Sequence, residues 1–240
     1  RRDHPQAREN GRRQVVVDPR VGETIQIGPL GLFTDTPSGI GRPAPALGEG
    51  QAEILGALAP RRDDGGRAGA VNEANAEDDA APPARRPLEG IVVVVCGYFS
   101  AAPFPATLLA EAGAKVIKVE PVEGDPGRRN WTASYSKVMV GKESIVVDLK
   151  TKEGREIVHE LVRRADVFLH NFRPGTPERL AIDFATLARI NPRLLYVYGS
   201  CFGSRGPWAH KAGFHSSPNA IVGPGVLEAG RGNPPQNRTY

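Results

Sequence analysis

The chain has 240 residues, of which 40% are hydrophobic and 24% are charged. This composition is ordinary for a globular protein, and the length allows a sizeable buried core. The net charge of +4 is modest and spread over short arginine pairs, so nucleic acid is not an expected partner, whereas an anionic small molecule fits the charge.

Two further absences limit the possible functions. Cys96 and Cys201 stand far apart beside apolar runs, which argues against a disulfide scaffold, and no Cys/His spacing predicts a metal site. The longest apolar run, 91–96, is too short to span a bilayer, and no secretory signal precedes it. We therefore expect a cytoplasmic protein without membrane contact. The chain begins without Met and ends in mid-pattern, so we expect a piece of a longer protein.

The first 86 residues contain few regular elements. A short β-like run covers 14–17, and Ile54, Leu55 and Leu58 are spaced for one face of a helix. Residues 60–86 are small, charged or Pro/Gly-rich, with Val71 as the one large aliphatic side chain. Such a segment cannot bury enough apolar surface to offset its chain entropy, so we predict a disordered linker.

Strand and helix signals alternate from residue 87 onward. Thr151 is placed to cap one of the helices. Strands are predicted over 91–96, 115–120, 144–148, 166–170 and 194–199, and helices over 105–112, from 151, over 176–180 and over 184–190. The alternation predicts an α/β fold, a Rossmann-like, mostly parallel sheet with flanking helices. Ligands bind such sheets at the carboxyl ends of the strands, which points to the loops 97–103, 120–129, 171–175 and 199–206.

Those loops and their flanking strands contain a series of motifs in a particular order and spacing. They are Leu88–Val94, Ala102–Pro103, Gly113–Pro121, Gly124–Pro126, Asp148–Gly154, Ala165–Gly175, Glu178–Leu180, Asn191–Leu194 and Gly206–Pro207. Together they resemble the N-terminal half of the class III CoA-transferases, the CaiB/BaiF family that includes formyl-CoA transferase-like enzymes. The resemblance implies the CoA-transferase family III fold in an incomplete form.

The first segment resembles the C-terminal end of the same family. Gly31–Phe33 through Arg42–Glu49, followed by a short helix, is similar to the closing stretch of these enzymes. The resemblance implies a tandem fusion in which 1–59 is the C-terminal tail of a preceding repeat, 60–86 is the linker and 87–240 is the N-terminal part of a second repeat. A lone N-terminal extension is the alternative. Family members form interlocked dimers, so the implied partner is a second repeat or subunit.

The resemblance also implies a chemistry and its substrates. Family members move CoA from an acyl-CoA to a carboxylic acid through an aspartate that attacks the thioester carbonyl. We align that aspartate with Gly213-Phe214-His215, so that His215 takes its place. An imidazole cannot form the same anhydride, although it can act as a base. His215 is then a vestigial pocket residue, a residue with a changed role, or the product of a misalignment.

The CoA-binding positions match the family better. Asn171, Phe172 and Arg173 match the loop that lies against the adenine and phosphate end of CoA, and Arg179 matches an arginine of that site. The loop whose backbone meets the pantetheine arm consists here of Tyr98, Phe99, Ser100 and Ala101. Glu143 replaces a family arginine, and a carboxylate near a phosphate would weaken CoA binding.

Three functions therefore remain open. The first is a CoA-transferase in which the other repeat supplies the nucleophile. The second is a non-catalytic CoA-binding or scaffolding half of a fused pseudo-dimer. The third is an acyl-CoA racemase, since the same fold hosts 2-methylacyl-CoA racemases, although His215 does not match their motif. CoA or acyl-CoA is expected as a substrate and no metal as a cofactor.

Overall fold

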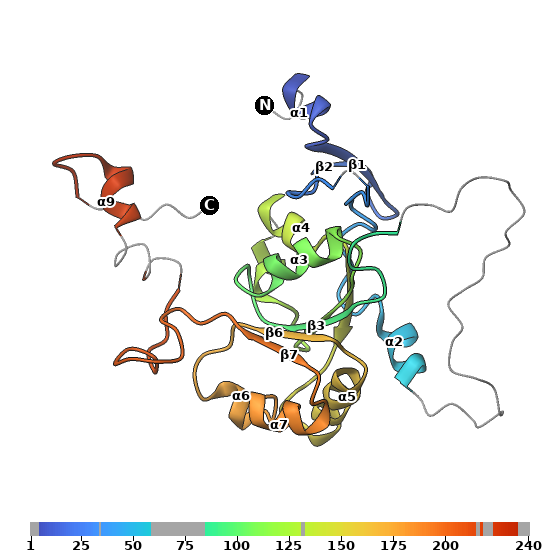
Figure 1. Ribbon diagram of the computed structural model, residues 1–240, viewed down its shortest axis with the longest axis vertical. Helices are drawn as coiled ribbons and strands as arrows, with labels where there is room; N and C mark the ends of the chain where they lie inside the picture. The colour runs from blue at the N-terminus through green and yellow to red at the C-terminus, as the bar shows by residue number, and fades with distance from the viewer. Residues whose placement is uncertain are drawn as a thin grey trace, which may run out of the picture.

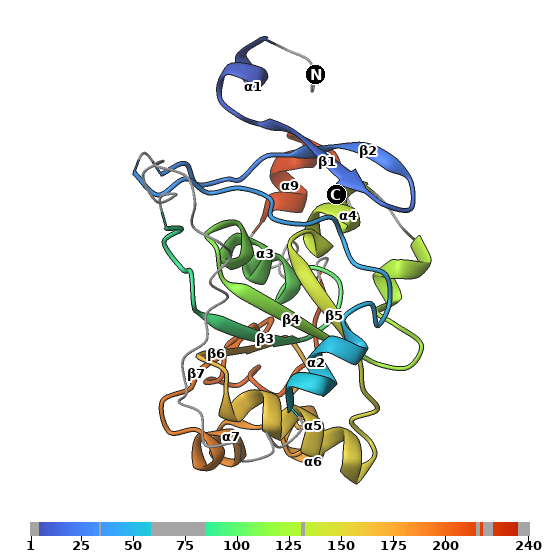
Figure 2. The same cartoon turned by 90° about the vertical axis from the view of Figure 1, so that its right-hand side faces the viewer.

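The computed structural model describes residues 5–33, 35–58, 85–130, 133–214, 217 and 223–234. Its centre is a five-stranded parallel sheet in the spatial order β5-β4-β3-β6-β7 (Figures 1 and 2). The strands are β3 (Val92–Cys96), β4 (Lys115–Glu120), β5 (Lys142–Val146), β6 (Val167–His170) and β7 (Leu195–Tyr198). The chain builds outward from β3, first to one side and then to the other, which makes the sheet doubly wound. The predicted α/β, Rossmann-like fold class is confirmed.

Helices cover both faces of this sheet (Figure 1). One face carries α3 (Pro103–Glu111) and α4 (Ala133–Met139). The other face carries α5 (Lys152–Arg163), α6 (Thr176–Arg179) and α7 (Phe184–Ile190). A short 3-10 helix, η1 (Pro126–Asn130), follows β4, and α9 (Pro224–Ala229) lies near the end of the described chain. Strands covered on both faces need apolar side chains in both directions, which is why the valine run predicts a central strand.

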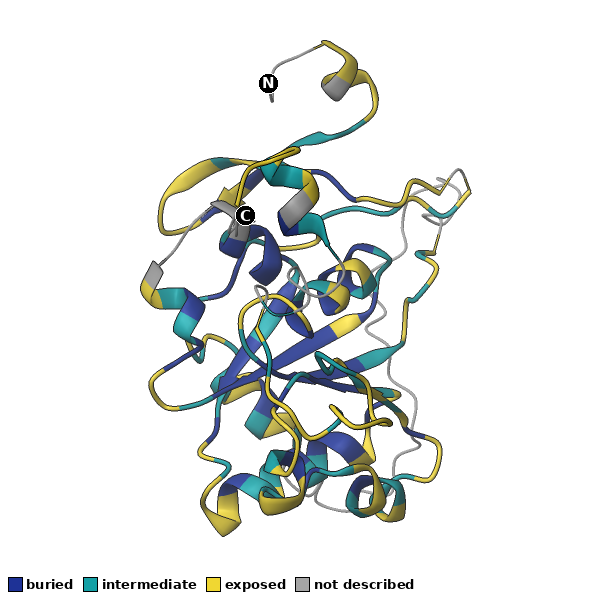
Figure 3. Ribbon diagram, turned by 90° about the vertical axis from the view of Figure 1, so that its left-hand side faces the viewer, coloured by how far each residue is buried: buried dark blue, intermediate teal, exposed yellow. Residues whose placement is uncertain are grey.

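Alternate side chains of β3 enter two different cores, and Figure 3 shows the central strands as buried. Val93 and Val95 pack in the core beneath α3, where Ala106 contributes a small side chain. Val94 and Cys96 belong to the core on the opposite face. The α5 side chains in that second core are Val158, Leu161 and Val162. The period-two alternation of β3 therefore distributes its apolar groups evenly between the two layers.

Side-chain caps fix where two helices of the second face begin. The Thr151 hydroxyl accepts a hydrogen bond from the Gly154 amide at 3.0 Å, which confirms the predicted cap of α5. The Asp183 carboxylate accepts a hydrogen bond from the Thr186 amide at 3.0 Å and starts α7 in the same way. These two caps set the lengths of the crossovers that lead into α5 and α7.

The N-terminal segment forms a hairpin and a short helix. Its elements are α1 (Pro5–Glu9), β1 (Arg13–Asp18), β2 (Gly22–Ile27) and α2 (Gln51–Leu58), with β1 and β2 paired antiparallel. The predicted strand at 14–17 and the predicted helix around Ile54 are both present, whereas the pairing strand β2 was not predicted. Figure 2 shows α2 beside β5 and α5, and the hairpin beyond α4.

This segment docks along the edge strand β5. The Gly50 amide donates to the Ser144 carbonyl at 2.9 Å. The Gln51 side chain accepts from the Val146 amide at 2.8 Å and donates to the Val146 carbonyl at 3.3 Å, so it occupies both backbone groups of that residue. Ile54 is 3% exposed and joins the core formed with α5. An edge strand that would otherwise offer unpaired backbone groups is thereby covered.

Element boundaries differ from the prediction mainly at β5. The strand predicted over 144–148 begins two residues earlier, because the parallel ladder pairs Val116 with Lys142 and Glu120 with Val146. A lysine is not expected inside a buried strand, but the Lys142 ammonium group donates to the Thr107 hydroxyl at 2.5 Å and to the Val138 carbonyl at 2.6 Å. The helix predicted over 105–112 likewise begins earlier, at Pro103.

Part of the predicted linker lies outside the described residues, namely 60–84. Arg86, the last residue of the predicted linker, donates to the Gly39 carbonyl at 3.4 Å, so the described end of the linker contacts the N-terminal segment. Among the helices that the structure describes, none is long and apolar enough to cross a bilayer.

Candidate functional site

The order of the strands reverses direction between β3 and β6, so the loops that follow these two neighbouring strands leave toward opposite sides. The Asn171 side chain closes the base of this crevice. Its oxygen accepts from the Tyr98 amide at 2.9 Å and its nitrogen donates to the Tyr98 carbonyl at 2.9 Å. Gly97 allows this approach, since a Cβ there would lie 2.2 Å from the Asn171 oxygen. Asn171 therefore acts as a clamp between the two predicted CoA-binding loops.

The loop after β3 has an unusual backbone conformation at Phe99. Its φ is +56°, in the left-handed region, where a residue with a Cβ loses about 1–2 kcal/mol relative to the right-handed form. The Phe99 amide points at the Asp125 carboxylate, with both oxygens at 3.2 Å. The Phe99 ring is 49% exposed, and Ser100 and Ala101 are exposed beside it. The fold therefore holds an exposed aromatic ring on this loop.

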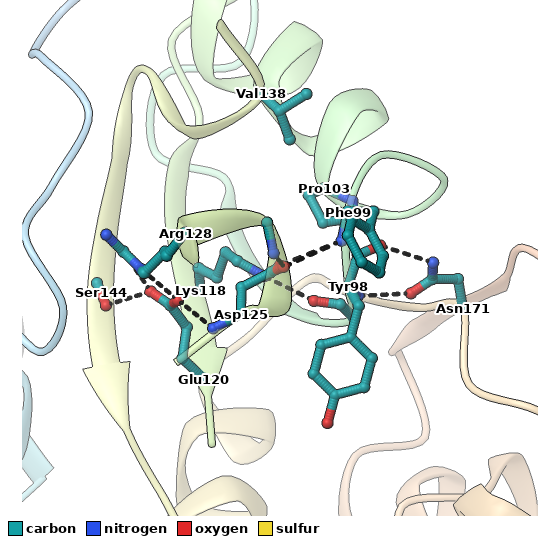
Figure 4. A network of polar contacts seen from close by, with 12 residues as sticks. Tyr98, Phe99, Pro103, Lys118, Glu120, Asp125, Arg128, Val138, Ser144 and Asn171 are labelled. Atoms are coloured by element: carbon teal, nitrogen blue, oxygen red, sulfur yellow. Dashed lines mark hydrogen bonds and ion pairs between the residues drawn. The ribbon is translucent and has the colours of Figure 1, made fainter. Parts of the chain in front are cut away.

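Asp125 belongs to a buried polar network that Figure 4 shows. Lys118 on β4 approaches the Asp125 carboxylate at 2.9 Å and donates to the Gly97 carbonyl at 2.6 Å. Glu120, also on β4, accepts from Arg128 at 2.6 and 2.7 Å and from the Ser144 hydroxyl at 2.6 Å. Burial tends to raise the pKa of Glu120, but the hydrogen bonds from Arg128 and Ser144 and the Lys118 charge bring it below its ordinary value.

This network already uses several backbone groups of the loop after β3. The Tyr98 amide and carbonyl are bound by Asn171, and the Phe99 amide is bound by Asp125. The groups that the loop offers outward are instead the Phe99 ring, Ser100 and Ala101. Of the loop predicted to meet a ligand, only Phe99, Ser100 and Ala101 therefore stay candidates for contact.

The loop after β6 divides its residues between the core and the surface. Phe172 is 8% exposed and packs edge-on against Tyr98, with ring centroids 5.5 Å apart. Arg173 and Arg179 are both exposed. The Arg179 guanidinium donates to the Thr176 hydroxyl at 3.2 Å, and neither arginine has a carboxylate partner among the described residues. Phe172 thus serves packing, whereas the two arginines are exposed.

His170, which carried no predicted role, supports this loop from below. Its ring is stacked on Tyr198 with centroids 4.6 Å apart, and its Nδ1 accepts from the Phe172 amide at 3.3 Å. Its Nε2 is then the protonated nitrogen and donates to the Tyr196 hydroxyl at 2.7 Å. Burial lowers the pKa of His170 to about 4, so the ring is neutral at physiological pH. Its place at the last residue of a strand was the signal in the sequence.

The segment after β7 returns to the same edge of the sheet. Gly213 packs against Cys201, whose sulfur would lie 2.3 Å from a Cβ at position 213. The Arg173 guanidinium lies 5.2 Å from the centroid of the Phe214 ring. The predicted Gly-Phe-His segment therefore leads to the Arg173 loop, and His215 itself lies outside the described residues.

A comparison with protein-family models decides the family. The model described as CoA-transferase family III matches residues 88–240. The chain belongs to CoA-transferase family III. Solved structures agree, since a CaiB/BaiF family protein from Brucella suis is 35% identical with a TM-score of 0.60, over 65% of this chain and 44% of that one. A hypothetical protein from Mycobacterium tuberculosis is 30% identical with a TM-score of 0.55, over 65% and 45% of the two chains.

Curated family III relatives include several named transferases. The acetyl-CoA:oxalate CoA-transferase of Acetobacter aceti is 40% identical over 148 residues, which is 57% of this chain and 37% of that protein. The succinyl-CoA–D-citramalate CoA-transferase of Chloroflexus aurantiacus is 42% identical over 146 residues, which is 58% of this chain and 36% of that protein. The chain thus spans little more than a third of the length of these relatives.

Glu143 lies away from the family III crevice. It is the second residue of β5, near the amino end of the sheet, whereas the crevice lies at the carboxyl ends. Its carboxylate approaches Arg42 at 3.0 Å and Lys115 at 3.4 Å. The Glu143 carboxylate is therefore matched by two cations of this chain.

Proposed function

We propose that the full-length protein transfers CoA between an acyl-CoA and a carboxylic acid, and that this part contributes CoA-binding residues of a site. The observation that carries the proposal is the exposure of two arginines that follow β6 at the switch point of the sheet, Arg173 in the loop and Arg179 at the end of α6. A guanidinium at a strand's carboxyl end can bind phosphate oxygens in a bidentate manner. Family membership supplies the reaction class.

The proposal assigns the nucleophile to the remainder of the protein. A carboxylate attacks the acyl-CoA thioester carbonyl, releases CoA thiolate and leaves a mixed anhydride. The thiolate then attacks the enzyme-side carbonyl of the anhydride, which forms an enzyme–CoA thioester and releases the donor acid as its carboxylate. His215 cannot enter that sequence as a carboxylate. In this proposal the described loops hold the nucleotide end of CoA while a carboxylate from another part of the protein attacks the thioester.

The docked N-terminal segment bears on the domain organisation of the protein. We propose that 1–59 is the tail of a preceding repeat, that 60–86 links it, and that 87–240 begins the second repeat. Its support is the docking of the N-terminal segment, in which Ile54 enters the core and Gln51 binds Val146. A lone N-terminal extension would not need a site in the core of the sheet domain, so the tandem arrangement is the stronger interpretation. The second subunit of an interlocked pair would then be replaced by a covalently joined repeat.

A non-catalytic CoA-binding half is the second candidate, favoured by the histidine at position 215. The two candidates differ in whether a covalent adduct forms. Incubation of the full-length protein with radiolabelled acyl-CoA, followed by hydroxylamine treatment and peptide mapping, should find a labile adduct outside residues 87–240. Bound CoA without any adduct would favour the non-catalytic candidate.

CoA binding itself can be tested with a matched pair of variants. Arg179→Gln should weaken CoA binding by roughly 10–100-fold, as expected when a charged hydrogen bond to phosphate is lost. Arg189→Gln is the control, because Arg189 is also exposed and donates to a threonine three residues earlier, Thr186, at 3.5 Å. Titration calorimetry with CoA measures both. Equal affinities of the two variants would refute the proposed phosphate contact.

A further inference from the structure

Beneath the exposed loop after β3 lies a charged pair outside the residues assigned to CoA binding. Lys118 and Asp125 are each 0% exposed, and their charged groups are 2.9 Å apart. Burying two charges costs desolvation free energy that their attraction does not always recover. Such a pair need not stabilise the fold, so its other contacts are informative.

Those contacts converge on three consecutive residues of the loop. The Lys118 ammonium donates to the Gly97 carbonyl at 2.6 Å, and the Asp125 carboxylate accepts from the Phe99 amide at 3.2 Å. Asn171 binds both backbone groups of Tyr98 between them. Figure 4 shows these side chains approaching the loop from two directions. The conformation of the loop is therefore imposed by side chains of other elements.

The imposed conformation is strained at one residue. Phe99 has a φ of +56°, and its ring is 49% exposed, so core packing does not account for the strain. Backbone strain that the surroundings enforce is commonly found where a group is held ready for a ligand. Asp125 is itself fixed from behind, because its amide donates to Glu120 at 3.1 Å and its carboxylate accepts from Gly127 at 2.8 Å.

We propose that Asp125, together with Lys118, is a positioning residue for CoA: it holds the Phe99 backbone so that the Phe99 ring and Ser100 face the bound molecule. This inference rests on the proposed CoA-binding function. Asp125 acts through the loop and does not touch CoA itself, since its side chain is fully buried.

A control variant of the same chemistry exists in this chain. Glu111 and Lys137 form a second buried ion pair, with side chains 4% and 8% exposed. That pair contacts the N-terminal segment, where the Leu30 amide donates to Glu111 at 3.3 Å. Glu111→Gln should therefore break a buried ion pair without disturbing Phe99.

The test compares Asp125→Asn with Glu111→Gln in the full-length protein. Amide hydrogen exchange without ligand should be at least about tenfold faster at Phe99 in Asp125→Asn than in Glu111→Gln. The KM for acyl-CoA should rise by roughly 5–30-fold in Asp125→Asn with kcat within about twofold of wild type, the fold-change that corresponds to lost preorganisation of one loop. Glu111→Gln should leave KM unchanged.

If Asp125→Asn does not fold, Lys118→Met/Asp125→Leu removes both charges at similar volume and is measured in the same way. Equal Phe99 exchange in the two single variants would overturn the proposal, and so would faster exchange with an unchanged KM. Failure of the wild-type protein to bind CoA would refute the proposed function instead. The exchange comparison would then decide alone whether Asp125 positions Phe99.

Discussion

Two buried lysine–carboxylate pairs serve different parts of this molecule. Lys118 and Asp125 hold the loop after β3, which lies 21 residues before Lys118 and 26 residues before Asp125 at the contacts with Gly97 and Phe99. Lys137 and Glu111 hold a segment that is about a hundred residues away in the sequence, since Lys137 donates to the Ile27 carbonyl at 2.8 Å. A buried ion pair adds little net stability relative to an apolar pair of similar volume. Its role in the fold is therefore best recognised from the backbone groups that it binds.

Lys142 provides a third case, in which the carboxylate is missing. Its ammonium group binds the Thr107 hydroxyl and the Val138 carbonyl instead. Burial therefore lowers the pKa of Lys142 well below its ordinary value. Through these two contacts the lysine ties α3 to α4 and β5 as a polar cross-link.

The largest effect is expected where the pair at the N-terminal segment is broken. Glu111→Gln leaves the Lys137 charge buried without a carboxylate, which should lower the free energy of unfolding by about 3–5 kcal/mol. Urea denaturation measures this change. Glu89→Gln is the control, because Glu89 pairs with Arg85 at 3.8 Å on the surface and should cost less than about 0.5 kcal/mol. Similar losses of unfolding free energy in both variants would show that burial of the Glu111–Lys137 pair does not raise the cost of breaking it.

The next largest effect is expected near the candidate site, where acid should lower the stability of the fold through His170, beneath the loop after β6. The folded pKa of His170 is about 4 and its unfolded pKa is about 6.5, so the folded state binds fewer protons between these values. Stability is then fully present above pH 6.5 and falls by about 2–3 kcal/mol as the pH drops toward 4. Urea denaturation across this range should show the slope, and His170→Gln should flatten it. An unchanged slope in the variant would assign the acid sensitivity to other groups.

The smallest effect concerns the second strained residue of the described chain. Ala181 has a φ of +54°, in the same left-handed region as Phe99. Unlike Phe99, it lies outside the loop after β3, and its carbonyl oxygen is 2.7 Å from His159 Nε2. Ala181→Gly should stabilise the protein by about 0.5–1 kcal/mol, since glycine adopts this conformation without steric cost. Ala188→Gly, within α7, should destabilise it by a similar amount. Thermal denaturation distinguishes the two, and a loss of stability in both would contradict the strain at Ala181.

Much of the fold could be predicted because the signals are local. The valine run at β3, the Thr151 cap and the alternation of strand and helix depend on neighbouring residues alone. The start of β5 could not be predicted in this way, because the pairing of Lys142 with Val116 and the acceptors of its ammonium group lie on other elements. For the candidate site, the motif predicted Arg173 and Arg179. The roles of Asp125 and His170 were missed, although His170 ends a predicted strand and Asp125 lies in a predicted loop, because these roles depend on contacts made after folding.

The sequence by itself determined the family, the alternation of strands and helices and the edge of the sheet at which a ligand is expected. Periodicity and motif spacing are properties of the chain, so they survive without knowledge of its contacts. The tertiary structure alone decided that Gly50 and Gln51 cover β5, that Glu143 is matched by Arg42 and Lys115, and that Asp125 reaches the backbone of Phe99. Each of these depends on groups far apart in the chain, which only folding brings within hydrogen-bonding distance.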